Sequence, residues 1–228
     1  MRTSAIIVAA GSGIRLGRPE PKAFVHVGGR SLLRWSLRTI ADVAEIAEVV
    51  IAVPAGRETA ARAEVTAAGL EVPVKIAAGG AERQDSVRIA LALTSVESEL
   101  VAIHDAARPL APAALWIACL RAAERVGGAI AAMPLADTLK RVEDRAITAT
   151  LPRAGLWQAQ TPQAFRRELL CEAHKRALET HVVATDDADL VERIGGQVEV
   201  VQSSALNLKI TTPEDLELAE ALASAEAG

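Results

Sequence analysis

A glycine-rich segment follows the first apolar run of the sequence and carries two basic residues. Gly11 and Gly13 form a Gly-x-Gly pair, and Arg15 and Lys22 follow it closely. Glycine lets backbone N–H groups approach an anion, and two nearby cations suit a triphosphate. The segment is neither a dinucleotide-binding GxGxxG, because Leu16 occupies the position of the third glycine, nor a P-loop, because no Gly-Lys-Ser/Thr follows. Taken alone, it favours a phosphate-binding loop and a flexible turn with solvated basic residues about equally.

Three further polar residues lie near the ends of apolar, strand-like runs. Asp105 is suited to hold Mg²⁺ or to orient Arg15, and a structural ion pair with Arg108 is the alternative. Lys209 lies just before a helix start and is suited to bind a phosphate, and an exposed surface lysine is the alternative. Thr185 is suited to contact a substrate, or only to cap the helix that follows it. Each residue taken alone therefore leaves both interpretations open.

Short apolar runs alternate with longer segments of helical spacing along the chain. The predicted strands are 5–10, 49–53, 74–78, 100–104, 129–133 and 198–201, and the predicted helices are 32–43, 60–68, 86–93, 115–126 and 216–223. Repeated βα units predict an α/β fold with a Rossmann-like, mostly parallel sheet and helices on both faces. For 228 residues we expect a single domain, with ligands bound beyond the carboxyl ends of the strands.

The segment 134–162 breaks this alternation. It has no helical period, but Thr138–Val142 and Ala146–Leu151 could pair as an irregular hairpin. The segment is longer than loops without a function usually are in a compact domain, and it is too apolar to be exposed to solvent throughout. We therefore predict a β-arm that protrudes from the sheet and contacts a partner.

The composition excludes several classes of protein. Aromatic residues make up 2% of the chain and the net charge is −4, so neither stacking platforms nor a general surface for nucleic acid is expected. No apolar run approaches the ~18 residues that a membrane span requires, and the first residues lack a secretory signal pattern. We expect a cytoplasmic protein that binds neither nucleic acid nor membranes. Cys119 and Cys171 are expected to be buried thiols, because neither has metal-site or CxxC spacing.

The loop at 9–22 is one of several ordered segments that are similar to those of one enzyme family. The others are 79–87, 104–109, 137–140, 161–163, 185–186 and 207–211. Together they resemble the 2-C-methyl-D-erythritol 4-phosphate cytidylyltransferases over nearly the whole chain. Two positions depart from the family pattern: Ala23 stands where Gln is usual, and Ala81 stands where an acidic residue is frequent.

The resemblance implies a group transfer between two phosphate compounds. CMP would pass from CTP to 2-C-methyl-D-erythritol 4-phosphate, giving 4-diphosphocytidyl-2-C-methyl-D-erythritol and pyrophosphate in the non-mevalonate isoprenoid precursor pathway. The implied cofactor is Mg²⁺ or another divalent metal, with Asp105 as its ligand. We interpret His104 as structural, because the attacking phosphate oxygen needs no base at neutral pH.

The resemblance also implies roles for individual residues. The implied catalytic residues are Arg15, Lys22, Asp105 and Lys209. The implied nucleotide contacts are Ala9, Ala10, Gly11, Gly13, Gly80 and Ser86. The residues implied to contact or place the polyol phosphate are Asp105, Arg108, Thr138, Arg153, Thr161 and Thr185. The segment 134–162 is implied to be the dimerisation arm of a homodimer, so that Arg153, with Thr138 and Thr161, would reach the partner's active site.

Two alternatives stay open at this point. The related ribitol-5-phosphate cytidylyltransferases share the loop and the reaction but tend to have Ser-Val after the His-Asp pair, where this chain has Ala106-Ala107. A non-catalytic CTP-binding module is the alternative from another class. The presence of Arg15, Lys22 and Lys209 argues against it, because these cations are suited to stabilise a transferring phosphate.

Overall fold

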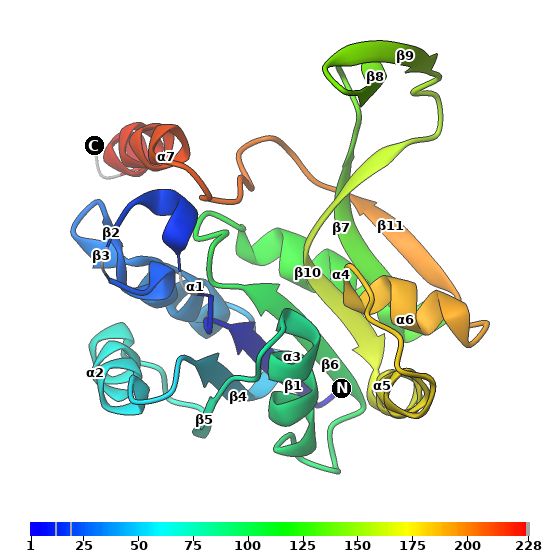
Figure 1. Ribbon diagram of the computed structural model, residues 1–228. Helices are drawn as coiled ribbons and strands as arrows, with labels where there is room; N and C mark the ends of the chain where they lie inside the picture. The colour runs from blue at the N-terminus through cyan, green and yellow to red at the C-terminus, as the bar shows by residue number, and fades with distance from the viewer. Residues whose placement is uncertain (12, 19, 227–228) are drawn as a thin grey trace.

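A seven-stranded sheet forms the centre of the molecule (Figure 1). The computed structural model describes residues 1–11, 13–18 and 20–226, without the side chains of residues 15, 225 and 226. The strands of the sheet are β1 (Thr3–Val8), β4 (Ile46–Val53), β5 (Val74–Ala78), β6 (Leu100–Asp105), β7 (Gly128–Pro134), β10 (Trp157–Arg166) and β11 (Val198–Gln202). Their spatial order is β11-β7-β10-β6-β1-β4-β5, and β10 alone among these described strands runs antiparallel to its neighbours. The predicted mostly parallel, Rossmann-like sheet is confirmed.

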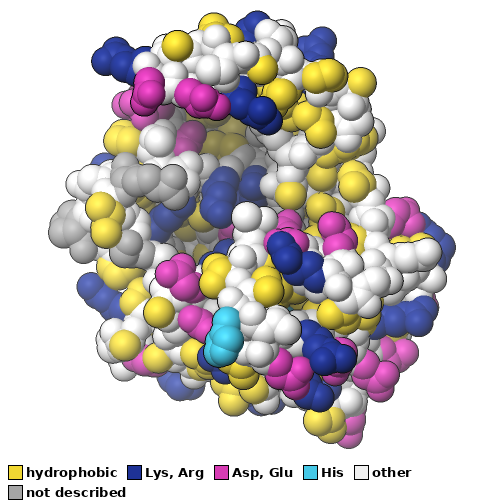
Figure 2. Space-filling model, turned by 45° about the vertical axis from the view of Figure 1, so that its right-hand side comes forward, with side chains coloured by type: hydrophobic (Ala, Val, Ile, Leu, Met, Phe, Trp, Pro, Cys, Tyr) yellow, Lys and Arg dark blue, Asp and Glu magenta, His cyan; other side chains and the backbone are white. Residues whose placement is uncertain are grey.

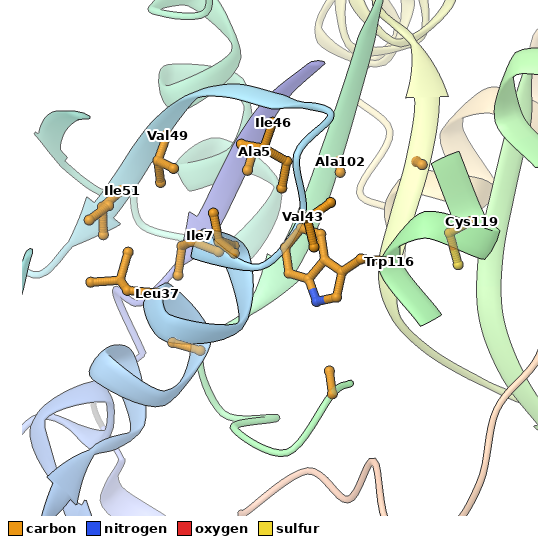
Figure 3. Packing of buried hydrophobic residues seen from close by; sticks show 14 of the residues in the cluster. Ala5, Ile7, Leu37, Val43, Ile46, Val49, Ile51, Ala102, Trp116 and Cys119 are labelled. Atoms are coloured by element: carbon orange, nitrogen blue, oxygen red, sulfur yellow. The ribbon is translucent and has the colours of Figure 1, made fainter. Parts of the chain in front are cut away.

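Helices cover both faces of this sheet, as predicted. One face carries α1 (Leu32–Ala41), α2 (Glu58–Ala68) and α4 (Ala113–Val126), and the other carries α3 (Arg83–Ala92), α5 (Arg167–Thr180) and α6 (Asp187–Arg193). Successive residues of a strand point to opposite faces, so Ile7 packs in the first cluster and Ile6 in the second. Figure 3 shows part of the first cluster, to which β1 contributes Ile7, α1 contributes Leu37 and α4 contributes Trp116.

A smaller cluster seats the last helix. It joins α7 (Pro213–Glu226) to the short strand β2 (His26–Val27), which pairs with β3 (Arg30–Ser31), and to the start of α1. Thr212 accepts a hydrogen bond from the backbone N–H of Asp215, and Pro213 takes the first helical position. This helix start is the one that the sequence indicates, and it places Lys209 just before α7.

The arm is narrower than the predicted segment 134–162. Its hairpin, β8 (Leu139–Glu143) and β9 (Ala146–Leu151), forms a separate two-stranded sheet that projects from the body (Figure 1). Residues 157–162 belong instead to β10 in the central sheet, so this end of the predicted arm is wrong. The hairpin turn is tight because Asp144 and Arg145 both adopt left-handed backbone conformations, with φ of 47° and 69°.

Burial tests the expectation for the two cysteines. Cys119 is fully buried, and burial raises the pKa of its thiol to about 12. Cys171 is only half-buried, so the expectation of a second buried thiol is wrong. No helix in the described part of the chain is long and apolar enough to cross a bilayer.

Glu48 forms a buried polar cluster in β4, away from the cavities described below. Its carboxylate accepts hydrogen bonds from Ser4 Oγ at 2.6 Å, from the backbone N–H of Ser95 and from Lys75 Nζ at 3.1 Å. Burial raises the pKa of Glu48, but these hydrogen bonds and the charge of Lys75 outweigh it and hold the pKa below its usual value. The ionised carboxylate therefore stabilises the fold.

This cluster makes stability depend on pH. A group whose pKa is lowered by folding contributes stability above its unfolded pKa and loses it as the pH falls through the folded pKa. We expect Glu48→Gln to reduce the free energy of unfolding by about 2 kcal/mol at pH 7, and the difference to shrink below about pH 4.5. Urea denaturation at pH 7 and at pH 3.5 measures this change, and an equal difference at both pH values would contradict it.

Candidate active site

A cavity of about 720 Å³ opens at the carboxyl ends of the strands. Its walls come from the loop after β1, the start of α3, the end of β6 and the segment before α7. Figure 2 shows a hollow beneath the projecting arm, with Lys and Arg side chains gathered inside it. The cavity therefore combines backbone-rich loops with positive charge, which suits a phosphorylated ligand.

The glycine-rich turn brings Lys22 to this cavity. Gly13 has a φ of 72° and precedes a short 3-10 helix, Ile14–Leu16, while a second 3-10 helix spans Lys22–Phe24. A Cβ on Gly13 would lie 3.0 Å from the Cβ of Lys22, so any other residue would both strain the turn and displace the lysine. The absence of a side chain at Gly13 therefore allows Lys22 to take its place at the cavity.

A second pair of glycines lets the loop after β5 approach the loop after β1. A Cβ on Gly79 would lie 2.4 Å from the Cβ of Ala10, and a Cβ on Gly80 would lie 2.3 Å from the Cβ of Asp85. The backbone N–H of Gly80 donates to Ser86 Oγ at 3.1 Å, and the Ser86 hydroxyl donates to the Glu82 carbonyl at 3.2 Å. These contacts fix the first turn of α3 against the cavity.

Asp105 ends β6 and is held by two cations. Lys209 Nζ lies 2.7 Å from Oδ2 of Asp105, and Arg83 Nε lies 3.0 Å from Oδ1. Burial raises the pKa of Asp105, but the charges and hydrogen bonds of Arg83 and Lys209 outweigh it and hold the pKa far below its usual range. The carboxylate is therefore ionised and fixed by both oxygens.

A neutral histidine lies behind this carboxylate. Thr161 Oγ1 accepts from the backbone N–H of Asp105 at 3.1 Å, which leaves its own proton for His104 Nδ1 at 3.0 Å. His104 Nε2 then donates to the carbonyl of Arg108 at 3.0 Å. Burial lowers the pKa of His104 to about 4, so the ring is neutral at physiological pH. His104 and Thr161 therefore position the backbone of residues 105–108.

A smaller cavity of about 180 Å³ adjoins the first. Arg108 lines it, and its guanidinium donates to the carbonyl of Asn207 at 2.7 Å. No carboxylate in the described part of the chain forms an ion pair with Arg108, whose guanidinium donates to backbone carbonyls instead, and its contact with a substrate stays a prediction. Both cavities share Arg83, Asp105 and Lys209 as a common wall. Two ligands bound in them would meet at this wall.

Comparison with known proteins identifies the family. The family model described as 2-C-methyl-D-erythritol 4-phosphate cytidylyltransferase matches residues 3–225. The chain belongs to this family. A protein of that name from Deinococcus radiodurans is 49% identical over 97% of this chain and 89% of its own length. The crystal structure of the enzyme of that name from Thermus thermophilus has a TM-score of 0.83 at 40% identity, covering 98% of this chain and 100% of that one. A structure of 4-diphosphocytidyl-2C-methyl-D-erythritol synthase from Anaerococcus prevotii has a TM-score of 0.85 at 31% identity, covering 98% of both chains.

Most of the residues predicted from the family resemblance come together at the two cavities. The larger cavity is lined by Ala9, Ala10, Gly11, Gly13, Lys22, Gly80, Ser86, Asp105 and Lys209, and the smaller one by Asp105, Arg108, Thr161, Thr185 and Lys209. Arg15 was predicted to be catalytic, and its side chain lies outside the described part of the structure. Thr161 is buried and lines the smaller cavity of its own chain, so the expectation that it reaches the partner's site is wrong. Thr138 and Arg153 lie exposed on or beside the arm and line neither cavity within this chain.

Two local alternatives for these residues are wrong, and a third is wrong only in part. Asp105 pairs with Arg83 and Lys209, not with Arg108. Lys209 is exposed, as an ordinary surface lysine would be, but its ammonium group is paired with the carboxylate of Asp105. Asp186, not Thr185, caps α6, because its side chain accepts from the backbone N–H of Asp189 at 3.0 Å. Thr185 is exposed at the smaller cavity and therefore remains a predicted substrate contact.

Sequence reasoning missed residues that complete the site. Arg83 lines both cavities, yet it was noted only as part of the segment 79–87. Gln163 Nε2 donates to Asp186 at 2.9 Å, and Asn207 Nδ2 donates to the carbonyl of Thr161 at 2.9 Å, so both fix the walls of the smaller cavity. Their places in the ordered family segments were the available signal, since nothing in their spacing indicates these contacts.

A divalent metal at this site would be bound mainly by the substrate. No cluster of three His, Cys, Asp or Glu side chains suited to a metal is found within the described residues. Asp105 is the carboxylate common to both cavities, and its two oxygens are already hydrogen-bonded. Mg²⁺ commonly takes one or two carboxylates together with phosphate oxygens and waters. The residues present therefore fit a metal carried by a triphosphate, and Asp105 as its ligand stays a prediction.

Removal of the cavity lysines should slow the reaction. We expect Lys22→Ala and Lys209→Ala each to fold and to lose about a hundredfold in kcat, because each removes a cation at the transferring phosphate. Lys175→Ala, on the exposed face of α5, is the matched control and should keep wild-type kcat. Steady-state release of pyrophosphate measures the change. A kcat near that of the wild type in either cavity variant would remove that lysine from the catalytic set.

Proposed function

We propose that the protein transfers CMP from CTP to 2-C-methyl-D-erythritol 4-phosphate and releases pyrophosphate. The observation that carries this proposal is the wall of Arg83, Asp105 and Lys209 shared by the two cavities. A triphosphate in the larger cavity and a small polyol phosphate in the smaller one would meet at the same cations. Membership of the family supports the identity of the two substrates.

The proposed reaction is an in-line displacement at phosphorus. A phosphate oxygen of the polyol phosphate attacks the α-phosphorus of CTP and forms a new P–O bond. The bond from the α-phosphorus to the bridging oxygen breaks, and pyrophosphate leaves with that oxygen. Because both reactants are anions, Lys22, Arg108 and Lys209 would reduce their repulsion and hold them in line. No base is required, which agrees with a neutral, fully engaged His104.

Magnesium is part of the proposal. When bound with CTP, the metal would neutralise charge on the triphosphate and on the departing pyrophosphate. Asp105 is the residue of this chain proposed to hold it. Lys22 would bind the triphosphate from the side of the glycine-rich turn, and Lys209 would bind it from the shared wall. The cations of the chain and the metal thus share the charge of the nucleotide.

The activity is tested directly with matched substrates. We expect pyrophosphate release from CTP with 2-C-methyl-D-erythritol 4-phosphate, and little with D-ribitol 5-phosphate or with ATP in place of CTP. Excess EDTA should abolish the release, and added Mg²⁺ should restore it. A higher kcat/KM with D-ribitol 5-phosphate would replace the proposed acceptor. Binding of CTP without turnover of any polyol phosphate would support the non-catalytic module instead.

The arm is proposed to join two copies of the chain. Val142 and Ile147 on the hairpin are 54% and 64% exposed, and Leu156 and Trp157 beside it are also exposed. Apolar side chains gathered on a projecting hairpin favour contact with another surface. Thr138 and Arg153 lie far enough along this arm to miss their own cavities. We therefore propose a two-fold dimer in which each arm supplies Arg153 to the partner's site.

Mixed dimers test this sharing of residues. Lys22→Ala and Arg153→Ala are expected to be inactive separately, and co-refolding them in equal amounts should return roughly a quarter of wild-type activity. About half of randomly paired dimers are mixed, and one of their two sites carries neither defect. Tagged copies of each variant allow the mixed dimer to be purified. A purified mixed dimer without activity would show that Arg153 acts within its own chain.

The cytoplasmic location expected from the sequence remains a proposal. It is supported by the choice of CTP as the donor substrate. Fractionation of the source cells, with detection of the protein in each fraction, measures it.

A further inference from the structure

A series of hydrogen-bonded polar side chains runs from α5 to the shared wall of the cavities. His174 Nε2 lies 3.1 Å from Oδ1 of Asp187, and Arg83 Nη1 lies 2.7 Å from Oδ2 of the same carboxylate. Arg83 Nε then lies 3.0 Å from Asp105, whose other oxygen binds Lys209. We call His174, Asp187, Arg83 and Asp105 the Arg83 bridge. It joins the interior of α5, the first residues of α6 and α3, and the end of β6.

The inner half of the bridge has no access to a substrate. His174 and Asp187 are 3% and 1% exposed, and neither lines one of the two cavities. Burial raises the pKa of Asp187, but the charge of Arg83 and the hydrogen bond of His174 outweigh it and keep the carboxylate ionised. Buried ion pairs are seldom more stabilising than well-packed apolar residues of similar volume. Stability alone is therefore a weak reason for this arrangement.

The geometry of Arg83 suits a positioning role. A guanidinium is a rigid planar fork, so donating through Nε and Nη1 to two separate carboxylates fixes both its place and its orientation. Arg83 occupies Oδ1 of Asp105, which leaves Oδ2 for Lys209. Without Arg83, the full charge of Asp105 would fall on Lys209 and the carboxylate could rotate. The lysine would then be held more tightly by the protein and would be less available to a phosphate.

We propose that Arg83 is a positioning residue for the transfer step, and that Asp187 and His174 set its orientation from outside both cavities. This inference rests on the proposed function, since its effect is on the rate of that reaction. Arg83 acts through Asp105 and Lys209 at the shared wall. Residues that influence the reaction are thus proposed to include His174 on α5, a helix that contributes no residue to the lining of either cavity.

The decisive variant separates stability from positioning. Arg83→Met alone leaves Asp187 buried without its cation and should lower both Tm and kcat. Arg83→Met combined with Asp187→Asn removes both charges, so Tm should return to within a few degrees of the wild type. We expect kcat in this double variant to stay about thirtyfold or more below the wild type, while the KM for CTP changes less than about threefold. Arg88→Met, which changes a partly exposed arginine on the same helix that lines neither cavity, is the matched control.

Three further variants keep the test independent of folding. Arg83→Lys retains the charge but cannot span two carboxylates as a fork, so kcat should fall about tenfold in a protein of normal Tm. His174→Leu should reduce kcat severalfold, and His174→Gln, which offers an amide N–H to Asp187, should restore most of it.

The outcomes distinguish this inference from the proposed function. A wild-type protein that releases no pyrophosphate with any polyol phosphate would overturn both. An active wild type, together with a double variant and an Arg83→Lys variant of wild-type kcat, would overturn the positioning role alone. A kcat that recovers in step with Tm in the double variant would assign Arg83 to stability only.

Discussion

The ion pairs of Asp105 are the interaction on which the rest of the site depends. A carboxylate beside two phosphates is unfavourable, because two unit charges 4 Å apart interact by about 4 kcal/mol at an effective dielectric constant of 20. Arg83 and Lys209 offset this repulsion and fix the carboxylate, since each donates to one of its oxygens. The same pairing brings one cation from α3 and another from the segment before α7 to a single wall. Both cavities therefore form around a charge that the fold has already neutralised.

The layer behind Asp105 is polar but uncharged. Thr161 links the backbone of Asp105 to His104, and Asn207 donates to the carbonyl of Thr161 and to Gln160 Oε1, each at 2.9 Å. A neutral network of this kind orients backbone groups without adding charge to a site that must hold two anions. Charged residues therefore face the cavities, and the neutral residues behind them hold the charged residues in place. His104 belongs to the second group, although its position at a strand end resembles that of a base.

The sequence predicts the sheet and the loops better than it predicts the contacts between them. The apolar runs of β1, β4, β6 and β7 indicate buried strands because both of their faces are covered. The runs of β5 and β11 were also recognised, although these edge strands are only partly buried. The strand β10 was missed because it contains three glutamines and Pro162, and a proline normally argues against a central strand. Pairing with β7 is interrupted between Ala159 and Gln163, and the proline lies within this interruption. Local pattern rules could not anticipate that solution.

The site residues also differ in how far apart in the sequence their contacts lie. Gly13 was indicated by its own glycine-rich segment, whereas Gly80 and Ser86 were indicated through the family resemblance, and the contacts of all three lie within short segments. The bridge from Arg83 to Asp187 joins residues 104 positions apart, and no spacing in the sequence indicates it. Arg83 was visible only as a basic residue near a glycine pair. Its hydrogen bonds join the first residues of α3 to the start of α6 and the end of β6, an arrangement that exists only in the assembled fold.

The late position of Lys209 in the chain has a consequence for synthesis on the ribosome. The lysine lies 104 residues after Asp105, and β10 must take its place between β6 and β7 before the smaller cavity can form. Contacts of such separation close slowly, and a nascent chain exposes its unpaired strand edges until they do. An N-terminal portion that ends before β10 would leave β6 and β7 with open edges and no cavity between them. Nearly all of the polypeptide must therefore leave the exit tunnel before the strands settle into their final order.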